Sequence, residues 1–195
     1  FSVSCALSYA IQKKADIINL SLGYYGQPDP ILEHYLNLCS SSIPSIEVFA
    51  AAGNIPNQHS SANLCNNHFN NNELTAKRLF YPACVSTQFT NITAVTQLNS
   101  ADRQCFYQNF SHQFVTVGIF DRTNCCAIKV AFLGHNPGYF EGSSFATPVA
   151  SGLKMEAMLQ SATTASAFWN SLIKINTSPQ VTVQGKYIEY DPIWP

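Results

Sequence analysis

Two polar side chains in this 195-residue chain occupy positions suited to acyl-transfer chemistry. Ser144 follows Gly142 and Ser143 at the predicted start of a helix, where unpaired backbone N–H groups create a partial positive potential around the hydroxyl. Asn54 follows Gly53 just after a predicted buried strand, and the glycine permits a tight turn that would swing the amide over the same site. The Ser144 N–H and the Asn54 amide are the kinds of donor that bind the oxyanion of a tetrahedral intermediate.

The apolar pattern of the chain predicts a scaffold that could hold these residues. Residues 16–22 and 46–52 are short apolar runs, typical of buried parallel strands. Between them a helix is expected from Asp29, as N-cap, and Pro30, at the first helical position, to about Ser41. Strand, helix and strand in this order imply a right-handed crossover, so we expect an α/β fold with three layers, a parallel β-sheet flanked by helices.

Further elements are expected along the chain. Helices are predicted over 2–14, where the sequence offers no recognisable cap, from Ser144 to about Leu159, and over 165–173. Short strands are predicted at 92–95 and 114–117, with a loop at 104–113 between them, and the Asn- and Ser-rich stretch 54–72 is expected to be a long surface loop. With no repeat and no interdomain linker, residues 1–195 are interpreted as part of a single domain.

Three segments, taken in order, resemble the subtilisin-like serine proteases, or subtilases. They are Ile18-Asn19-Leu20-Ser21-Leu22-Gly23, Val48-Phe49-Ala50-Ala51-Ala52-Gly53-Asn54, and Gly142-Ser143-Ser144-Phe145-Ala146-Thr147-Pro148. In that family the nucleophile lies in a Gly-Thr-Ser-Met-Ala-Thr/Ser-Pro segment, from which Ser143 and Phe145 are modest departures. Tyr81-Pro82-Ala83 and the strand after it are also similar, so the resemblance covers nearly the whole chain.

The resemblance implies a role for each segment. Ser144 would be the nucleophile of an endopeptidase, and Asn54 would stabilise the oxyanion. The two sides of the S1 pocket, which takes the substrate side chain before the scissile bond, would be Ser21, Leu22 and Gly23 on one wall and Ala51, Ala52 and Gly53 on the other. Residues 21–23 would also pair main chain to main chain with an extended polypeptide substrate. Phe80 falls where the family commonly has a small residue at the pocket base, which predicts a shallow pocket without naming a preferred substrate residue.

The general base and its orienting carboxylate are missing from the pattern. The family carries them in Asp-Ser/Thr-Gly and His-Gly-Thr segments before the first helix seen here, and none of the five histidines has the expected neighbours or order. We therefore expect the N-terminal portion of the catalytic domain to be missing from these residues. That portion, in the same or a separate chain, would be a partner of this one, together with a possible propeptide.

Other interpretations of the same residues remain open. Gly142-Ser143-Ser144 alone suits an ordinary Ser-rich helix cap. Gly142-x-Ser144-x-Ala146 approximates the nucleophile elbow of α/β-hydrolases, but Asn136-Pro137-Gly138 precedes it where that motif needs a hydrophobic strand. A catalytically inactive, subtilase-like domain that binds peptides or a partner is the main alternative to an enzyme.

Composition excludes some classes of function. The chain has 10 Lys and Arg against 11 Asp and Glu, so charge-driven nucleic-acid binding is not expected. No apolar run is long enough to span a membrane. A polar but weakly charged surface leans towards a secreted or otherwise extracytoplasmic location, and sequons at Asn91, Asn109 and Asn176 would suit a glycosylated exterior, whereas one at Asn19 lies within an apolar run.

Cysteines and metals add little to this interpretation. The seven cysteines are an odd number and form no CxxC pair, so they predict buried thiols with one or two disulfides rather than a metal site. The chemistry implied by the resemblance requires no cofactor. Some subtilases bind structural Ca²⁺, but no Asp-rich EF-type loop is visible here.

Overall fold

A seven-stranded sheet forms the centre of the chain in the computed structural model, which describes residues 2–55, 72–100, 103–105, 107–122, 127–131, 137–160, 162–176 and 181–191. In spatial order its strands are β1 (Ile17–Leu20), β3 (Glu47–Ala51), β5 (Ile92–Ser100), β7 (Val117–Asp121), β11 (Lys186–Tyr190) and β10 (Ile173–Ile175), with β6 (Arg103–Gln104) on β5. Strands β1 to β11 in this order are parallel, whereas β10 and β6 are antiparallel to their neighbours.

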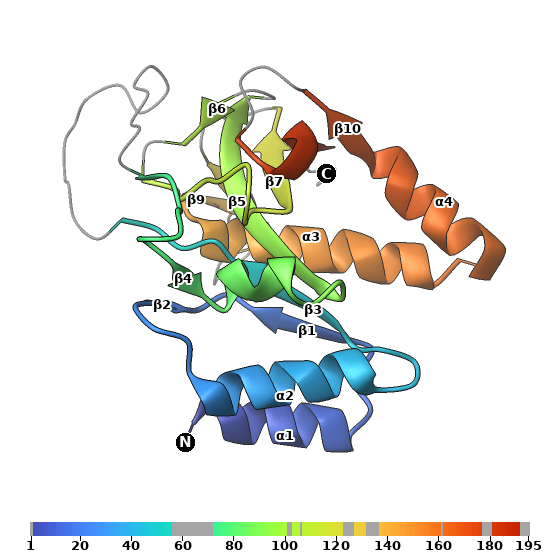
Figure 1. The fold of residues 1–195 in the computed structure, drawn as a ribbon. Helices are drawn as coiled ribbons and strands as arrows, with labels where there is room; N and C mark the ends of the chain where they lie inside the picture. Colours follow the sequence, from blue (N-terminus) through green and yellow to red (C-terminus); the bar gives the residue numbers. More distant parts are fainter. Residues whose placement is uncertain are drawn as a thin grey trace.

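Helices cover both faces of this sheet. Figure 1 shows α1 (Val3–Gln12) and α2 (Pro30–Ser41) side by side on one face, and α3 (Ser143–Met158) with α4 (Ala162–Leu172) on the other. Consecutive residues of β3 contribute to separate cores, because Val48 packs with Leu36 of α2 while Phe49 packs with Ala146 of α3. This alternation is what a strand buried on both faces requires. The predicted three-layer α/β fold is confirmed.

Two short ribbons lie outside the main sheet. Strand β2 (Tyr24–Tyr25) pairs antiparallel with β4 (Phe80–Tyr81), which is followed by the 3₁₀-helix η2 (Ala83–Thr87). Strand β8 (Ile128–Ala131) pairs with β9 (Pro137–Phe140), and a second 3₁₀-helix, η3 (Val183–Gly185), precedes β11. The sequence indicated only a turn at residues 24–29, because a two-residue strand is too short to show an alternating pattern.

The helix boundaries show which local signals decided the fold. Helix α2 begins as predicted, since Asp29 Oδ1 accepts the Ile31 N–H at 2.8 Å and Pro30 occupies the first turn. The expectation that the first helix lacks a cap is wrong, because the Ser2 hydroxyl accepts the Cys5 N–H at 3.3 Å. The strand expected at 114–117 begins instead at Val117, and the buried side chains of Phe114 and Val115 that suggested it precede the strand.

Two of the sequons expected on a glycosylated exterior are buried. Asn91 is 6% exposed and its Nδ2 donates to the Ile46 carbonyl at 2.7 Å. Asn109 is 0% exposed and its Nδ2 donates to the Ala52 carbonyl at 2.8 Å. Both amides hold neighbouring segments together, so they cannot carry a glycan in the folded chain.

Burial also sets the state of the thiols. Cys5 is exposed, whereas burial raises the pKa of Cys39 and of Cys84 to about 11. Cys65, Cys125 and Cys126, and most of the loop predicted at 54–72, lie outside the described residues. Within the described ranges, none of the helices is long and apolar enough to cross a membrane.

Candidate active site

A cleft of about 310 Å³ opens where β1 and β3 end and α3 begins. Since parallel strands end at the same edge of a sheet, the segments after β1 and β3 lie together there. The cleft is lined by Ser21, Leu22, Gly23, Tyr24, Tyr25, Ala51, Gly53, Asn54, Phe80, Ser143 and Ser144. Ser144 and Asn54, which sequence analysis selected separately, therefore line the same cleft.

The start of α3 has a backbone conformation that requires glycine. Gly142, its N-cap, has φ of 138°, a region that residues with a side chain rarely adopt. A Cβ added at Gly142 would lie 3.2 Å from Asn54 Nδ2 and 3.3 Å from Ser144 Oγ. The amide and the hydroxyl are thus neighbours beside Gly142, close enough for one carbonyl group in the cleft to contact both.

Hydrogen bonds fix the direction of the Asn54 amide. Its Oδ1 accepts the Ser143 N–H and the Ser143 hydroxyl, each at 3.0 Å, and Ser143 Oγ accepts the Gly53 N–H at 3.0 Å. Because a backbone N–H can only donate, Oδ1 must face Ser143. Nδ2 therefore points away from Ser143, and no described residue accepts a hydrogen bond from it.

Two buried glutamines hold the segment that carries the serines. Gln97 Oε1 accepts the Gly142 N–H and Gln108 Oε1 accepts the Ser143 N–H, both at 2.6 Å. Gln97 lies in β5, and Gln108 lies in the predicted loop, where it forms a bridge with Asn54. We call Gly53, Asn54, Gln97, Gln108 and residues 142–144 the nucleophile corner.

Sequence analysis missed Ser143, Gln97 and Gln108 as parts of this corner. The one available signal was Gln97, an amide within the apolar strand Ile92-Thr93-Ala94-Val95-Thr96-Gln97-Leu98. A buried polar side chain needs a hydrogen-bond partner, so the position of Gln97 indicates a specific hydrogen bond without identifying the partner.

Ser144 presents two groups to the cleft. Its side chain is half-buried at the second position of α3, and its N–H has no acceptor among the described residues. Nor does its hydroxyl donate to any side chain in the described ranges. Of the histidines that the structure describes, His34 stands on the exposed side of α2, and His112 pairs with Glu73 at 3.0 Å. Neither of them lines the cleft.

The two predicted walls of the S1 pocket both contact one aromatic ring, that of Phe80. Ser21, Leu22 and Gly23 line the cleft on one side, and Ala51 and Gly53 on the other. Ala52 does not line it, because it is fully buried and its carbonyl accepts from Asn109. Phe80 lies at the base, as expected, and is 7% exposed.

Tyr24, Tyr25 and Phe80 line one side of the cleft, and Tyr81 packs against Tyr24 outside the lining. Tyr25 meets Phe80 edge to face at a centroid distance of 4.9 Å, and Tyr24 stacks on Tyr81 at 5.8 Å. Burial raises the pKa of Tyr24 and of Tyr81, so both phenols stay neutral at physiological pH. We call Tyr24, Tyr25, Phe80 and Tyr81 the aromatic wall.

The described residues bring together no group of three or more His, Cys, Asp or Glu side chains that could hold a metal ion. Close to the cleft, the carboxyl group nearest in sequence to Ser144 is Glu141, whose pKa is raised by burial. No Asp, Glu or His side chain lines the cleft among the described residues, and its polar groups are hydroxyls, the Asn54 amide and backbone groups.

A mainly parallel sheet lies between two layers of helices, with a serine at the start of α3 and an asparagine after β3 beside one cleft. This arrangement is that of a subtilisin-like α/β domain. A family model described as the Subtilase family matches residues 1–175, and the chain belongs to this family. A comparison with curated proteins found no match.

Solved structures share this fold at low sequence identity. The patellamide maturation protease PatA gives a TM-score of 0.63 at 20% identity, over 95% of this chain and 64% of PatA. A structure of the subtilase cytotoxin SubAB assembly gives 0.66 at 17%, over 95% of this chain and 61% of that one. The prenylagaramide maturation protease PagA gives 0.57 at 23%, over 80% and 48%. This chain therefore spans less than two thirds of each of these structures.

Proposed function

We propose that this chain is the C-terminal part of the catalytic domain of a serine endopeptidase. The observation that carries the proposal is that Asn54 and Ser144 line the same cleft, with Asn54 Nδ2 and Ser144 Oγ 3.2 and 3.3 Å from the position that a Cβ on Gly142 would take. A substrate carbonyl held in the cleft beside them would meet a nucleophile and an oxyanion donor together.

The proposed reaction proceeds through an acyl-enzyme. Ser144 Oγ forms a bond to the carbonyl carbon as its proton passes to a general base, and the carbonyl oxygen becomes an oxyanion held by the Asn54 amide and the Ser144 N–H. The C–N bond then breaks, and the base returns the proton to the amine that leaves. Water cleaves the ester by the same steps in reverse. The hydroxyl, the amide and the base carry the whole sequence, so it requires no cofactor.

The base and its carboxylate come, in this proposal, from an N-terminal part of the same catalytic domain, in the same or a separate polypeptide. Neither His34 nor His112 reaches the cleft, and β1 pairs only with β3 among the described strands, which leaves one of its edges open for a further strand. The substrate is an extended polypeptide segment, which residues 21–23 would bind main chain to main chain. A propeptide, structural Ca²⁺ and an extracytoplasmic location remain proposals on the family resemblance and composition.

Labelling of the full-length protein with a fluorophosphonate probe tests the proposal. We expect one labelled residue, Ser144, identified by mass spectrometry of the modified peptide. Ser144→Ala should abolish labelling and peptide cleavage, whereas Ser151→Ala, on the same helix with its hydroxyl bonded to the Pro148 carbonyl, should retain both. A folded full-length protein that takes no label, or cleavage that survives Ser144→Ala, would favour the peptide-binding alternative or another nucleophile.

A further inference from the structure

The space between the two walls of the cleft is occupied by the ring of Phe80. A Cβ added to Gly53 would lie 2.6 Å from Phe80 Cζ and 2.7 Å from Cε1, and one added to Gly23 would overlap Cε1 and lie 2.7 Å from Cζ. The same edge of the ring therefore touches both glycines. Phe80 therefore fills the space next to both glycines, and the Tyr81 carbonyl also occupies the space next to Gly23.

Hydrogen bonds and ring packing hold Phe80 in this position. Tyr25, its partner in the β2–β4 ribbon, packs edge to face against the ring. The Tyr25 hydroxyl donates to Asn109 Oδ1 at 2.8 Å and accepts from Arg78 Nη2 at 3.1 Å, while the Arg78 guanidinium lies 5.2 Å from the Tyr25 ring centroid.

Asn109 links this arrangement to the opposite wall. Its side chain donates to the Ala52 carbonyl at 2.8 Å, and its N–H donates to the Gly53 carbonyl at 3.0 Å. Tyr25 follows residues 21–23, which form one wall of the pocket. The buried side chain of Asn109 thus connects Tyr25 to residues 51–53, which form the other wall. We call these hydrogen bonds of Asn109 the clamp, because they connect Tyr25 with the main chain of Ala52 and Gly53.

We infer that Phe80, locked by Tyr25 and Asn109, closes the S1 pocket, so that the substrate residue on the acyl side of the scissile bond is Gly or Ala. The inference rests on the proposed function and names its substrate class. A longer side chain at that position would have to displace a ring that is packed on both sides.

A series of peptides that differ only in this residue tests the inference on the full-length protein. We expect kcat/KM for Gly and Ala to exceed that for Leu and Phe by about 100-fold, since a closed pocket discriminates strongly by size. Phe80→Ala should reverse the order, and Phe80→Val, which removes less volume, should shift it in the same direction. A wild-type protein that cleaves after Leu or Phe as well as after Ala would overturn the inference.

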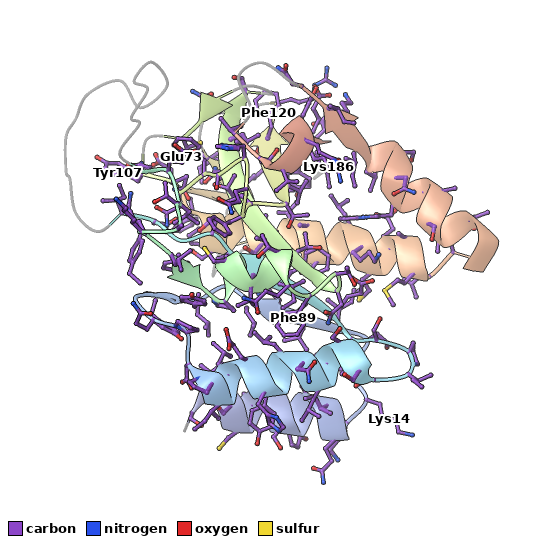
Figure 2. All side chains as sticks on the ribbon, in the orientation of Figure 1. Lys14, Glu73, Phe89, Tyr107, Phe120 and Lys186 are labelled. Atoms are coloured by element: carbon purple, nitrogen blue, oxygen red, sulfur yellow. The ribbon has the colours of Figure 1, made fainter. Side chains whose placement is uncertain are left out.

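Phe89→Ala is the matched control. Phe89, labelled in Figure 2, packs against the same core cluster as Phe80 but does not line the cleft. It removes the same side-chain volume and should leave the substrate ranking unchanged. A ranking altered equally by Phe89→Ala would mean that general loosening of the core, rather than opening of the pocket, sets the preference.

Binding separates this inference from the proposed function. If the full-length protein neither cleaves peptides nor takes the fluorophosphonate label, the proposed function fails. The affinity of the same peptides for the Ser144→Ala variant still measures the pocket. Tighter binding of the Gly and Ala peptides, reversed by adding Phe80→Ala, supports the inference, and equal or undetectable binding of all the peptides overturns it.

Discussion

The nucleophile corner and the aromatic wall border the same cleft but are held in place by different forces. In the corner, hydrogen bonds that the side-chain oxygens of Gln97, Gln108 and Asn54 accept from backbone N–H groups fix the direction of each group. In the wall, ring contacts among Tyr24, Tyr25, Phe80 and Tyr81 fill volume. Hydrogen bonds are directional, whereas packing is sensitive mainly to shape.

This difference separates two properties of the proposed enzyme. Changes in the corner should lower turnover for every peptide by a similar factor, because they misplace the reacting groups. Changes in the wall should alter the ranking among peptides, because they alter the space available to a side chain. Each prediction below tests this division.

The largest effect is expected for Asn54→Ala. Loss of one oxyanion donor should lower kcat about 10²- to 10³-fold with KM nearly unchanged, a magnitude taken from subtilisin, a member of the same family. Steady-state kinetics on the full-length protein measures it. Asn37→Ala, which changes an exposed asparagine of α2, is the control and should have no effect. A selective loss on one peptide of the series, with the others unaffected, would show that the corner also sets preference.

The next effect is expected for Gln97→Met, a nearly isosteric change that removes the acceptor. The Gly142 N–H has no other acceptor among the described residues, so removal of Gln97 Oε1 leaves this donor unpaired. We expect a loss of about 1–3 kcal/mol of unfolding free energy. Since Gln97 does not line the cleft, it is a positioning residue, and its removal should lower kcat about 10- to 100-fold through displacement of residues 142–144.

Gln97→Glu, which keeps an acceptor oxygen, distinguishes positioning from simple stability. It should recover more of kcat than of unfolding free energy, because the buried carboxylate is itself costly. Denaturant unfolding and kcat, measured on the same preparations, make the comparison. If kcat follows stability alone in both variants, Gln97 has only a structural role.

The sequence predicted the wall less completely than the corner. Ser144 and Asn54 were found because glycine, a strand end and a helix start are local signals. Phe80 was expected at the pocket base only through the family resemblance, and nothing in the sequence placed Tyr25 next to it, since the two residues are paired across a ribbon that joins distant segments.

Asn109 shows the same limit from the other side. Its sequon suggested an exposed glycan, but tertiary contacts bury it as the link between the two walls. The order β1, α2 and β3 followed from caps and apolar runs. Strand β10 was missed because three residues are too few to show a period, and β11 was missed although it pairs with β7, a strand distant in the sequence. Local chemistry was thus predictable, and contacts between distant segments were not.

A smaller effect is expected on Cys84, which lies behind the aromatic wall. Its Sγ accepts the Phe80 N–H at 3.3 Å, and burial raises its pKa to about 11, so at pH 8 only about 10⁻³ of it is thiolate. Alkylation should therefore be slow and should accelerate about tenfold per pH unit below the pKa. Phe80→Ala should admit water, lower the pKa and raise the alkylation rate about tenfold at fixed pH.

Cys39 is the matched control for this experiment. Its pKa is also about 11 through burial, but it lies in α2, in the same core cluster as Cys84, and the hydrogen bond from the Phe80 N–H goes to Cys84. Phe80→Ala should leave its alkylation rate unchanged, as followed by mass spectrometry of the two peptides. Equal acceleration at both cysteines would mean that Phe80 supports the whole core rather than the wall alone.

The smallest effect is expected for Tyr25→Phe, which keeps the ring against Phe80 but removes the hydroxyl from the clamp. Loss of the hydrogen bond to Asn109 should cost about 1 kcal/mol of unfolding free energy. It should lower the preference for Gly and Ala over Leu and Phe only a few-fold, because ring packing still holds Phe80. Tyr25→Ala removes both contributions and should move the ranking most of the way to that of Phe80→Ala. If Tyr25→Phe alone opens the pocket as fully as Tyr25→Ala does, hydrogen bonding rather than packing would control the wall, and the division between the two regions would fail.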